Sequence, residues 1–334
     1  MCKNGYFLYF LYTVIVILKC LTKGIAMPLK ILSSLFFVST SLLFSLEFDY
    51  HLKPKKVTEN LYCFFGSLEN ISKRNGGNMV NSCYVQTKEG FVVIDSGPTF
   101  AYASQSYEAM QKIKKLPVKY VINTHIHDDH WLGNSFYKDK GAKLIGPKNY
   151  EEEIVPKMQT RMERILGKAL FGQTKIVPLD KVVEQNLSLA LGGTKFEIRQ
   201  VEPIAHTKGD LIVYMASQKI LFVGDLVFNG RITSLRDGSL LGSLKALEKI
   251  DSYDAKVIIT GHGYQTDANS THEFKAYLSG IKREVLKAQE SDIGMEKITK
   301  VVTMPHFKTL KLYDVLHNRN VLDAYGELEL IDDE

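Results

Sequence analysis

Cysteine is scarce in this chain, which has four among 334 residues. Cys2 and Cys20 fall in the apolar N-terminal region, so only Cys63 and Cys83 remain beyond it. Both lie on predicted strands, and two strand cysteines are too few for a cysteine-ligated metal site. In an oxidising compartment they could form a disulfide with their α-carbons ~4.4–6.8 Å apart. Two small buried thiols are the alternative.

Hydrophobic runs long enough to span a membrane are also missing. The N-terminal runs Tyr6–Leu18 and Ile31–Leu46 both fall short of the ~20 residues that a membrane-spanning helix needs. The second run follows Met27 and a lysine and precedes a polar stretch, which predicts a signal peptide over residues 1–46. We therefore expect an exported, periplasmic mature chain from 47 to 334. A membrane anchor that is retained and faces the periplasm, or a true start at Met27, would fit the same pattern.

The charge of the mature chain is nearly balanced. The formal net charge of the whole chain is +5, and the leader contributes four lysines and no acidic residue. Removing the leader therefore leaves about +1, because five minus four is one. No basic stripe follows the chain, so we expect no nucleic-acid partner, and contact with a membrane only through an uncleaved leader.

Strands and helices fill the mature chain. Apolar runs rich in Val, Tyr and Phe predict the strands, and apolar residues at helical spacing predict the helices. Each half has strands followed by a helix, and no linker divides them, which indicates one domain with two sheets face to face and helices outside. The predicted strands are 61–65, 82–87, 91–94, 119–123, 142–145, 195–201, 211–215, 220–223 and 256–260, and the predicted helices are 101–115, 149–170, 240–250, 272–288 and 311–330.

A dense cluster of metal-ligating residues follows the predicted strand 119–123. It contains His125, His127, Asp129 and His130 within six residues. His125 and His127 are two positions apart, so on an extended segment their side chains point the same way and suit one metal ion. Asp129 and His130 can then turn toward a second metal ion nearby.

Three later residues extend this pattern. His206, Asp225 and His262 each come just after a predicted strand of the second half. Side chains at strand ends are held by a rigid sheet, as a catalytic site requires. We therefore expect residues from both halves to converge on one metal centre.

The spacing His-x-His-x-Asp-His, followed by a later His, Asp and His, resembles the metallo-β-lactamase superfamily over nearly the whole mature chain. The resemblance implies the α/β fold of that superfamily, a four-layer αββα sandwich with two zinc ions at one edge between the sheets. It also implies the ligands of these ions. One zinc would lie on His125, His127 and His206, the second on Asp129, His130 and His262, and Asp225 would bridge both.

Two further aspartates are candidates for supporting roles. Asp95 matches an early aspartate of the superfamily at a strand end, and we expect it to orient a metal ligand from behind. Asp210 is a weaker candidate for the same role, with a capping or surface role as the alternative. The polar segment 66–81 predicts a long loop, which either folds over a substrate or is a plain surface loop.

The resemblance implies hydrolysis of a small molecule. Two zinc ions can share a bridging hydroxide whose pKa falls to ~7 or below, and their charge favours the oxyanion of a tetrahedral intermediate. Asp129 is the candidate to orient that hydroxide. We expect cleavage of an ester, thioester, lactone or amide bond. Asp225 stands where β-lactamases of the superfamily typically have Cys or Ser, so the site is more similar to the glyoxalase II and lactonase type.

Two alternatives remain open at this stage. Segments 224–228 and 234–239 resemble periplasmic metallohydrolases encoded near sulfur-oxidation or quinoprotein systems. Because of that link, one alternative is a persulfide dioxygenase of the same superfamily, with one iron on His125, His206 and Asp225. The full second set, Asp129, His130 and His262, argues against it, since one iron would not need these residues. The second alternative is a non-enzymatic periplasmic protein that binds a metal or a redox partner.

Overall fold

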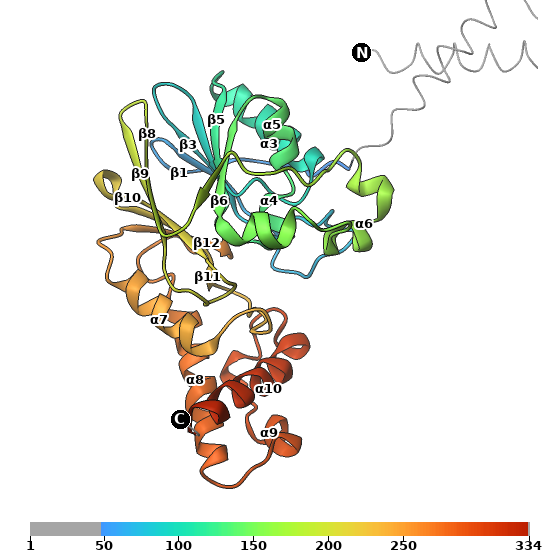
Figure 1. The fold of residues 1–334 in the computed structure, drawn as a ribbon, viewed down its shortest axis with the longest axis vertical. Coiled ribbons are helices and arrows are strands. Elements are labelled where there is room, and N and C mark those ends of the chain that lie inside the picture. Colours follow the sequence, from blue (N-terminus) through green and yellow to red (C-terminus); the bar gives the residue numbers. More distant parts are fainter. Residues whose placement is uncertain (1–47, 333–334) are drawn as a thin grey trace, which may run out of the picture. The chain divides into compact units, whose positions relative to one another are not determined.

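The computed structural model describes residues 48–332, which belong to one compact unit, Phe48–Glu334 (Figure 1). The signal peptide predicted over residues 1–46 lies outside the described residues. From residue 48 to residue 332, no helix combines the length and the apolar character needed to cross a bilayer.

The first half of the unit forms a seven-stranded sheet in the order β1 to β7. Its strands are β1 (Lys55–Thr58), β2 (Leu61–Phe64), β3 (Ser82–Gln86), β4 (Phe91–Ile94), β5 (Val118–Ile122), β6 (Lys143–Pro147) and β7 (Lys181–Val183). Neighbours are antiparallel from β1 to β4 and parallel from β4 to β7. Because parallel strands end at the same edge, the segments after β4 and β5 meet there.

The second half forms a five-stranded sheet in the order β12-β11-β10-β9-β8. Its strands are β8 (Asn186–Leu191), β9 (Thr194–Gln200), β10 (Leu211–Met215), β11 (Ile220–Phe228) and β12 (Val257–His262). Only β11 and β12 pair in parallel. Every predicted strand is present. The strands that the sequence analysis missed, β1, β7 and β8, have many exposed side chains and therefore a weak apolar signal.

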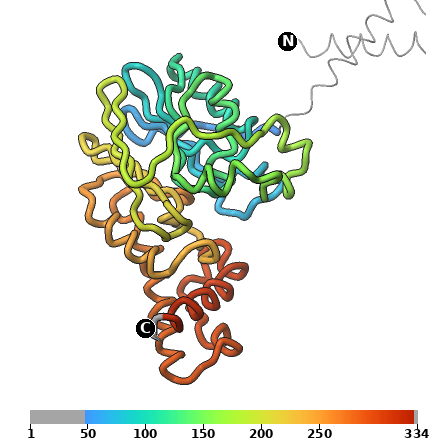
Figure 2. Tube along the Cα trace, in the orientation of Figure 1, coloured from blue at the N-terminus to red at the C-terminus, as the bar shows by residue number. Residues whose placement is uncertain are grey.

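The two sheets pack face to face and share an apolar core. Val85 and Ile94 of the first sheet and Phe196, Val213 and Phe222 of the second sheet are buried in this core. Figure 2 shows the chain path through both sheets, with the first in blue to green and the second in yellow to orange. The core fixes how the edges of the two sheets face each other, and so positions residues from both halves.

Helices cover the outer face of each sheet. The helical elements are α3 (Phe100–Ile113), α4 (Asp128–Trp131), α5 (Asn134–Asp139), η1 (Tyr150–Ile154), α6 (Arg161–Phe171), η2 (Ala216–Gln218), α7 (Leu240–Asp251), α8 (His272–Gln289), α9 (Met295–Val301), η3 (Pro305–Phe307) and α10 (Tyr313–Asp332). Tyr102 and Met110 of α3 pack on Tyr84 and Phe91 of the first sheet. Helices α7, α8 and α10 form the outer core of the second sheet. The structure thus confirms the predicted four-layer αββα sandwich.

The single helix predicted over residues 149–170 is wrong, because the structure divides it into η1 and α6. Pro156 has no N–H to continue the hydrogen-bond ladder. A new helix then starts at Thr160, whose hydroxyl accepts a hydrogen bond from the backbone N–H of Glu163. As a result Met158 falls between the helices and is 99% exposed, whereas Met162 is buried.

A disulfide joins Cys63 of β2 to Cys83 of β3. The two residues are direct partners in the antiparallel register, and both are fully buried. Their α-carbons lie 4.1 Å apart, slightly below the ~4.4–6.8 Å expected from the sequence. The disulfide therefore cross-links two strands inside the core between the sheets.

Candidate metal centre

The loop after β5 positions the histidine cluster. Thr124 donates hydrogen bonds from its backbone N–H and its hydroxyl to the two oxygens of Asp95, both at 2.8 Å. His125 lies in a bend after the strand, His127 is the extended residue that precedes α4, and the short helix α4 carries Asp129 and His130. The carboxylate of Asp95 at the end of β4 therefore anchors the start of the loop that carries four site residues.

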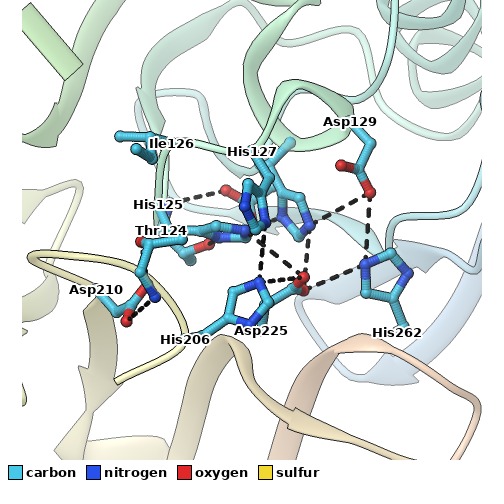
Figure 3. A network of polar contacts seen from close by, with 12 residues as sticks. Thr124, His125, Ile126, His127, Asp129, His206, Asp210, Asp225 and His262 are labelled. Carbon is cyan, nitrogen blue, oxygen red and sulfur yellow. Dashed lines mark hydrogen bonds and ion pairs between the residues drawn. The ribbon is translucent and has the colours of Figure 1, made fainter. Parts of the chain in front are cut away.

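The structure brings all seven predicted site residues together in two groups (Figure 3). In the first group, the potential ligand atoms of His125, His127, His206 and Asp225 all lie within 4.8 Å of one another. His127 presents Nδ1 to this group, 2.9 Å from His206 Nε2. His206 arrives from the loop between β9 and β10, so the first group combines residues of both halves.

The second group consists of Asp129, His130 and His262. All three side chains are buried. Asp129 Oδ2 lies 3.4 Å from His262 Nε2 and 3.7 Å from His130 Nε2. This group therefore also draws on both sheets, since His262 ends β12.

Asp225 lies between the two groups. Its Oδ2 is 3.2 Å from His206 Nε2 and 3.6 Å from His125 Nε2. Its Oδ1 is 3.1 Å from His130 Nε2 and 3.2 Å from His262 Nε2. Each oxygen thus faces a different group, as a bridging carboxylate would.

The sequence analysis expected Asp225 to follow the strand, but Asp225 lies within β11. β11 continues past residue 223 to Phe228. The strand passes close to the histidine loop at Gly224, where a β-carbon would meet Thr124 Oγ1 at 2.5 Å. Gly261 of β12 makes a similar close approach, because a β-carbon there would meet Asp225 Oδ1 at 1.9 Å. The absence of side chains at these two positions allows the carboxylate to reach the centre.

Hydrogen bonds from behind orient the histidine rings. His130 Nδ1 lies 2.8 Å from Asp95 Oδ2, which is the supporting position expected for Asp95. His262 Nδ1 donates to the backbone oxygen of Met79 at 2.7 Å. His127 Nε2 lies 3.2 Å from Asp237 Oδ2. These contacts fix which ring nitrogen faces the centre.

Asp210 has a capping role. Its two oxygens accept hydrogen bonds from the backbone N–H and the hydroxyl of Thr207, at 2.8 and 2.6 Å. It therefore stiffens the turn next to His206 and makes no hydrogen bond to that ring. Of the two roles considered for Asp210 from the sequence, the structure supports the capping role and not the orientation of a metal ligand.

Arg161, at the start of α6, contacts the site, and the sequence analysis did not predict this contact. Its Nη2 lies 2.7 Å from Asp128 Oδ1 and 3.0 Å from Asp129 Oδ1. Asp128 in turn accepts a hydrogen bond from the backbone N–H of Met162 at 2.6 Å. Arg161 thus holds the Asp129 oxygen that points away from the centre. Asp237 was also missed, although it lies in the segment 234–239 that the sequence analysis singled out.

Burial and neighbouring charges set the protonation of the centre. Burial lowers the pKa of His125 well below its usual value and also lowers the pKa of His262. Burial alone would raise the pKa of Asp129, but His130 and Arg161 outweigh it and lower this pKa to about 2. The pKa of Asp225 is likewise well below its usual value, because surrounding histidines outweigh burial. Burial alone would lower the pKa of His130 and His206, but Asp225 and other nearby carboxylates outweigh it and raise the pKa of both rings, that of His130 well above its usual value. A metal ion binds the neutral imidazole, so metal binding here would release protons from these two rings.

The centre opens into a cavity of about 580 Å³. His127, Asp129, His206, Asp225 and His262 all line it. Further walls come from the loop 66–81, from the segments 154–159 and 228–237, from α6 and from the start of α10. The loop also holds the end of β12, because Asn81 donates to the backbone oxygens of Thr260 and Gly263. A small molecule in this cavity would therefore meet both groups of ligating side chains.

This αββα sandwich, with His and Asp side chains gathered at one edge between its sheets, defines a metallohydrolase class of protein. A family model of the metallo-β-lactamase superfamily matches residues 75–262, more than half of the chain. The chain belongs to the metallo-β-lactamase superfamily.

Individual relatives support the same assignment. The chain is 25% identical over 207 residues to a hydroxyacylglutathione hydrolase of Brucella anthropi, covering 61% of this chain and 69% of the relative. It is 27% identical over 193 residues to a hydroxyacylglutathione hydrolase of Pelagibacter ubique, covering 56% and 70%. A solved metallo-β-lactamase from Pontibacter korlensis matches with a TM-score of 0.55 at 22% identity, covering 68% of this chain and 99% of that one. At that identity the structural match shows the fold alone.

Proposed function

We propose that this protein is a hydrolase that uses two zinc ions to cleave an ester, thioester, lactone or amide bond. The observation that carries the proposal is the position of Asp225, whose two oxygens face two separate groups of ligating side chains. The names of the relatives, hydroxyacylglutathione hydrolases, support hydrolysis of an acyl bond. The same geometry supports the site residues inferred from the sequence.

Buried polar atoms test whether this site fits two cations. His125 Nε2, His130 Nε2 and Asp225 Oδ1 are buried and find no hydrogen-bond partner among residues 48–332. Such atoms are costly to bury unless something satisfies them. All three atoms lie where the two groups of potential ligands meet at Asp225. Imidazole nitrogen and carboxylate oxygen together form a donor set that zinc accepts. The residues therefore fit the metal ions.

Each residue has a distinct role in this proposal. His125, His127 and His206 would hold one zinc, Asp129, His130 and His262 the other, and Asp225 both. When bound, the two ions supply a hydroxide nucleophile near neutral pH and polarise the substrate carbonyl.

Asp129 is the proposed catalytic residue. Its Oδ1 is held by Arg161, while its Oδ2 faces the centre. In this proposal Oδ2 would accept a hydrogen bond from the nucleophile and orient it toward the substrate.

The disulfide supports an exported protein. Cys63 and Cys83 are bonded in the described structure, and such bonds persist mainly in oxidising compartments. We accordingly propose that residues 1–46 direct export to the periplasm and that 47–334 form the catalytic domain.

Metal analysis combined with a substrate panel tests the function. We expect the purified full-length chain to contain about two zinc ions and to hydrolyse members of a panel of esters, thioesters, lactones and β-lactams. Asp225→Asn should lower metal content and turnover together, because both groups lose a shared ligand. One iron and no zinc per chain would favour the persulfide dioxygenase. Two bound metals without turnover on any substrate would favour the non-enzymatic alternative.

A further inference from the structure

A second cavity opens at the surface beside α6, next to the cavity of the metal centre. Its volume is about 440 Å³, and none of the seven site residues lines it. Three lysines and three apolar side chains are among the residues that do. They are Lys157, Lys168, Lys175, Met158, Phe171 and Ile176, and we call this group the basic hollow. The group combines positive charge with apolar surface in one place.

The lysines of the basic hollow carry charges that the domain does not neutralise. All three are exposed, and none forms an ion pair within residues 48–332. Between positions 157 and 175 the chain has five basic residues and one acidic residue. Arg161 already pairs with Asp128 and Asp129, so the other four basic residues face the single carboxylate of Glu163. The surface around the hollow is therefore positive and suits an anionic partner.

Apolar side chains lie exposed among these cations. Met158, between η1 and α6, is 99% exposed, and Ile165 on α6 is 36% exposed. Ile165 and Lys157 line the neighbouring cavity together. One exposed apolar residue is ordinary on a protein surface. Apolar side chains surrounded by lysines and arginines are instead typical of surfaces that rest on a membrane.

Helix α6 is held with this basic side outward. Met162 and Leu166 are buried in a cluster that also contains Trp131. The opposite side of the helix carries Arg164 and Lys168, and both are exposed. Because the apolar side is packed on the core, the basic side faces outward without any rearrangement of the fold.

The start of the described chain lies close to α6. The ring of Phe48 lies against Gly76, where an added β-carbon would meet it at 2.7 Å, and Gly77 lies likewise against Met162 of α6. Two apolar runs, 6–18 and 31–46, precede Phe48 in the sequence. A leader that enters a bilayer, during export or as a retained anchor, would therefore bring this side of the domain to the membrane surface.

We propose that the basic hollow and Ile165 bind the surface of a bilayer that contains anionic phospholipids. The lysines pair with the phosphate groups, while Met158 and Ile165 enter the boundary between headgroups and acyl chains. Nucleic acid carries similar phosphate charge but offers no apolar phase to Met158, so we assign the bilayer. Lys157 lines both cavities, and a bound bilayer would therefore lie at the mouth of the cavity that contains the metal centre. Binding of the bilayer does not depend on the proposed hydrolysis.

A tryptophan in place of Met158 reports the contact directly. The chain has one tryptophan, Trp131, which is 1% exposed and gives a constant background. We expect the fluorescence of full-length Met158→Trp to shift to the blue when vesicles of phosphatidylcholine and phosphatidylglycerol are added, and to be quenched by brominated lipid. Val301→Trp is the matched control, because Val301 is 54% exposed on α9 and lines neither cavity. The control should show no shift.

Charge variants in the Met158→Trp background measure the contribution of the lysines. Each lysine near an anionic surface contributes about fivefold to binding, so Lys168→Gln with Lys175→Gln should raise the lipid concentration for half of the shift by about 25-fold. Lys168→Arg with Lys175→Arg keeps both charges and should bind like the parent. Lys287→Gln with Lys300→Gln removes two exposed lysines of α8 and α9 and should leave the midpoint unchanged. Added salt should weaken binding of the parent, because it screens the anionic surface.

Four results would overturn the proposal. An uncleaved leader can carry the chain to vesicles by itself, and the chain then sediments with them while the indole of Met158→Trp stays in water. An equal shift in Val301→Trp would show adsorption without a defined surface. An unchanged midpoint with phosphatidylcholine alone, or after loss of both lysines, would remove the basis in charge. A short DNA duplex that binds more tightly than the vesicles would assign the surface to nucleic acid.

Discussion

The contact between Arg161 and Asp129 predicts that a residue from α6 controls one metal group and not the other. Arg161 binds the outward oxygen of Asp129, which belongs only to the second group. Arg161→Met keeps the aliphatic stem and removes these hydrogen bonds. Asp129 could then rotate, and it would also lose a neighbouring cation that helps to keep its pKa near 2. We therefore expect weaker metal binding at the second group.

The size of the effect follows from the geometry. Loss of a hydrogen-bond partner behind a metal ligand typically costs 10- to 100-fold in affinity. The Arg161 side chain is 43% exposed, so water replaces part of the lost interaction. We accordingly expect the lower end, about tenfold, or about 1.4 kcal/mol. The first group makes no contact with Arg161 and should keep its affinity.

Zinc titration of the metal-free full-length chain, in competition with a chromophoric chelator, measures both affinities. Arg164→Met is the matched control, because this residue lies one turn further along α6 and makes no contact with Asp128 or Asp129. Equal weakening of both groups, or unchanged affinity at the second, would refute the reasoning. A similar loss in the control would show that the effect comes from α6 as a whole.

Two further predictions concern the first group and the core. His127→Ala should lower metal content and turnover together, since it removes one ligand of the first group; normal turnover after metal is lost would contradict the mechanism. Replacing Cys63 and Cys83 by Ala should lower the free energy of unfolding by about 3 kcal/mol, as the disulfide spans 20 residues. Urea unfolding with and without reducing agent checks this value, and an unchanged midpoint in the double variant would contradict it.

Local patterns in the sequence determined much of the fold. Apolar runs bounded by turns identified the central strands, because such strands are buried and their residues are uniformly apolar. Exposed edge strands such as β1 carry a mixed pattern and escaped this reasoning. The helix over 149–170 failed because helical spacing continued past Pro156, where the missing N–H ends the helix.

The sequence also predicted which residues lie together at the candidate metal centre. The spacing within 125–130 places four ligating side chains on one loop, and short-range geometry makes that pattern recognisable. The order of the later His, Asp and His could be recognised through resemblance to a family. The positions of these three residues in the chain were enough to predict that they belong to the centre, because each lies at or near the end of a strand.

Tertiary structure alone decided which residues support that centre. Arg161 reaches Asp129 across 32 positions of the chain, and Asp237 reaches His127 across 110. Arg231 is distinguished only by what surrounds it, since a buried arginine whose Nη1 finds no hydrogen-bond partner in the described part of the chain looks like any other arginine in the sequence. Long-range contacts and burial depend on how the two sheets pack, and no local pattern of residues encodes them.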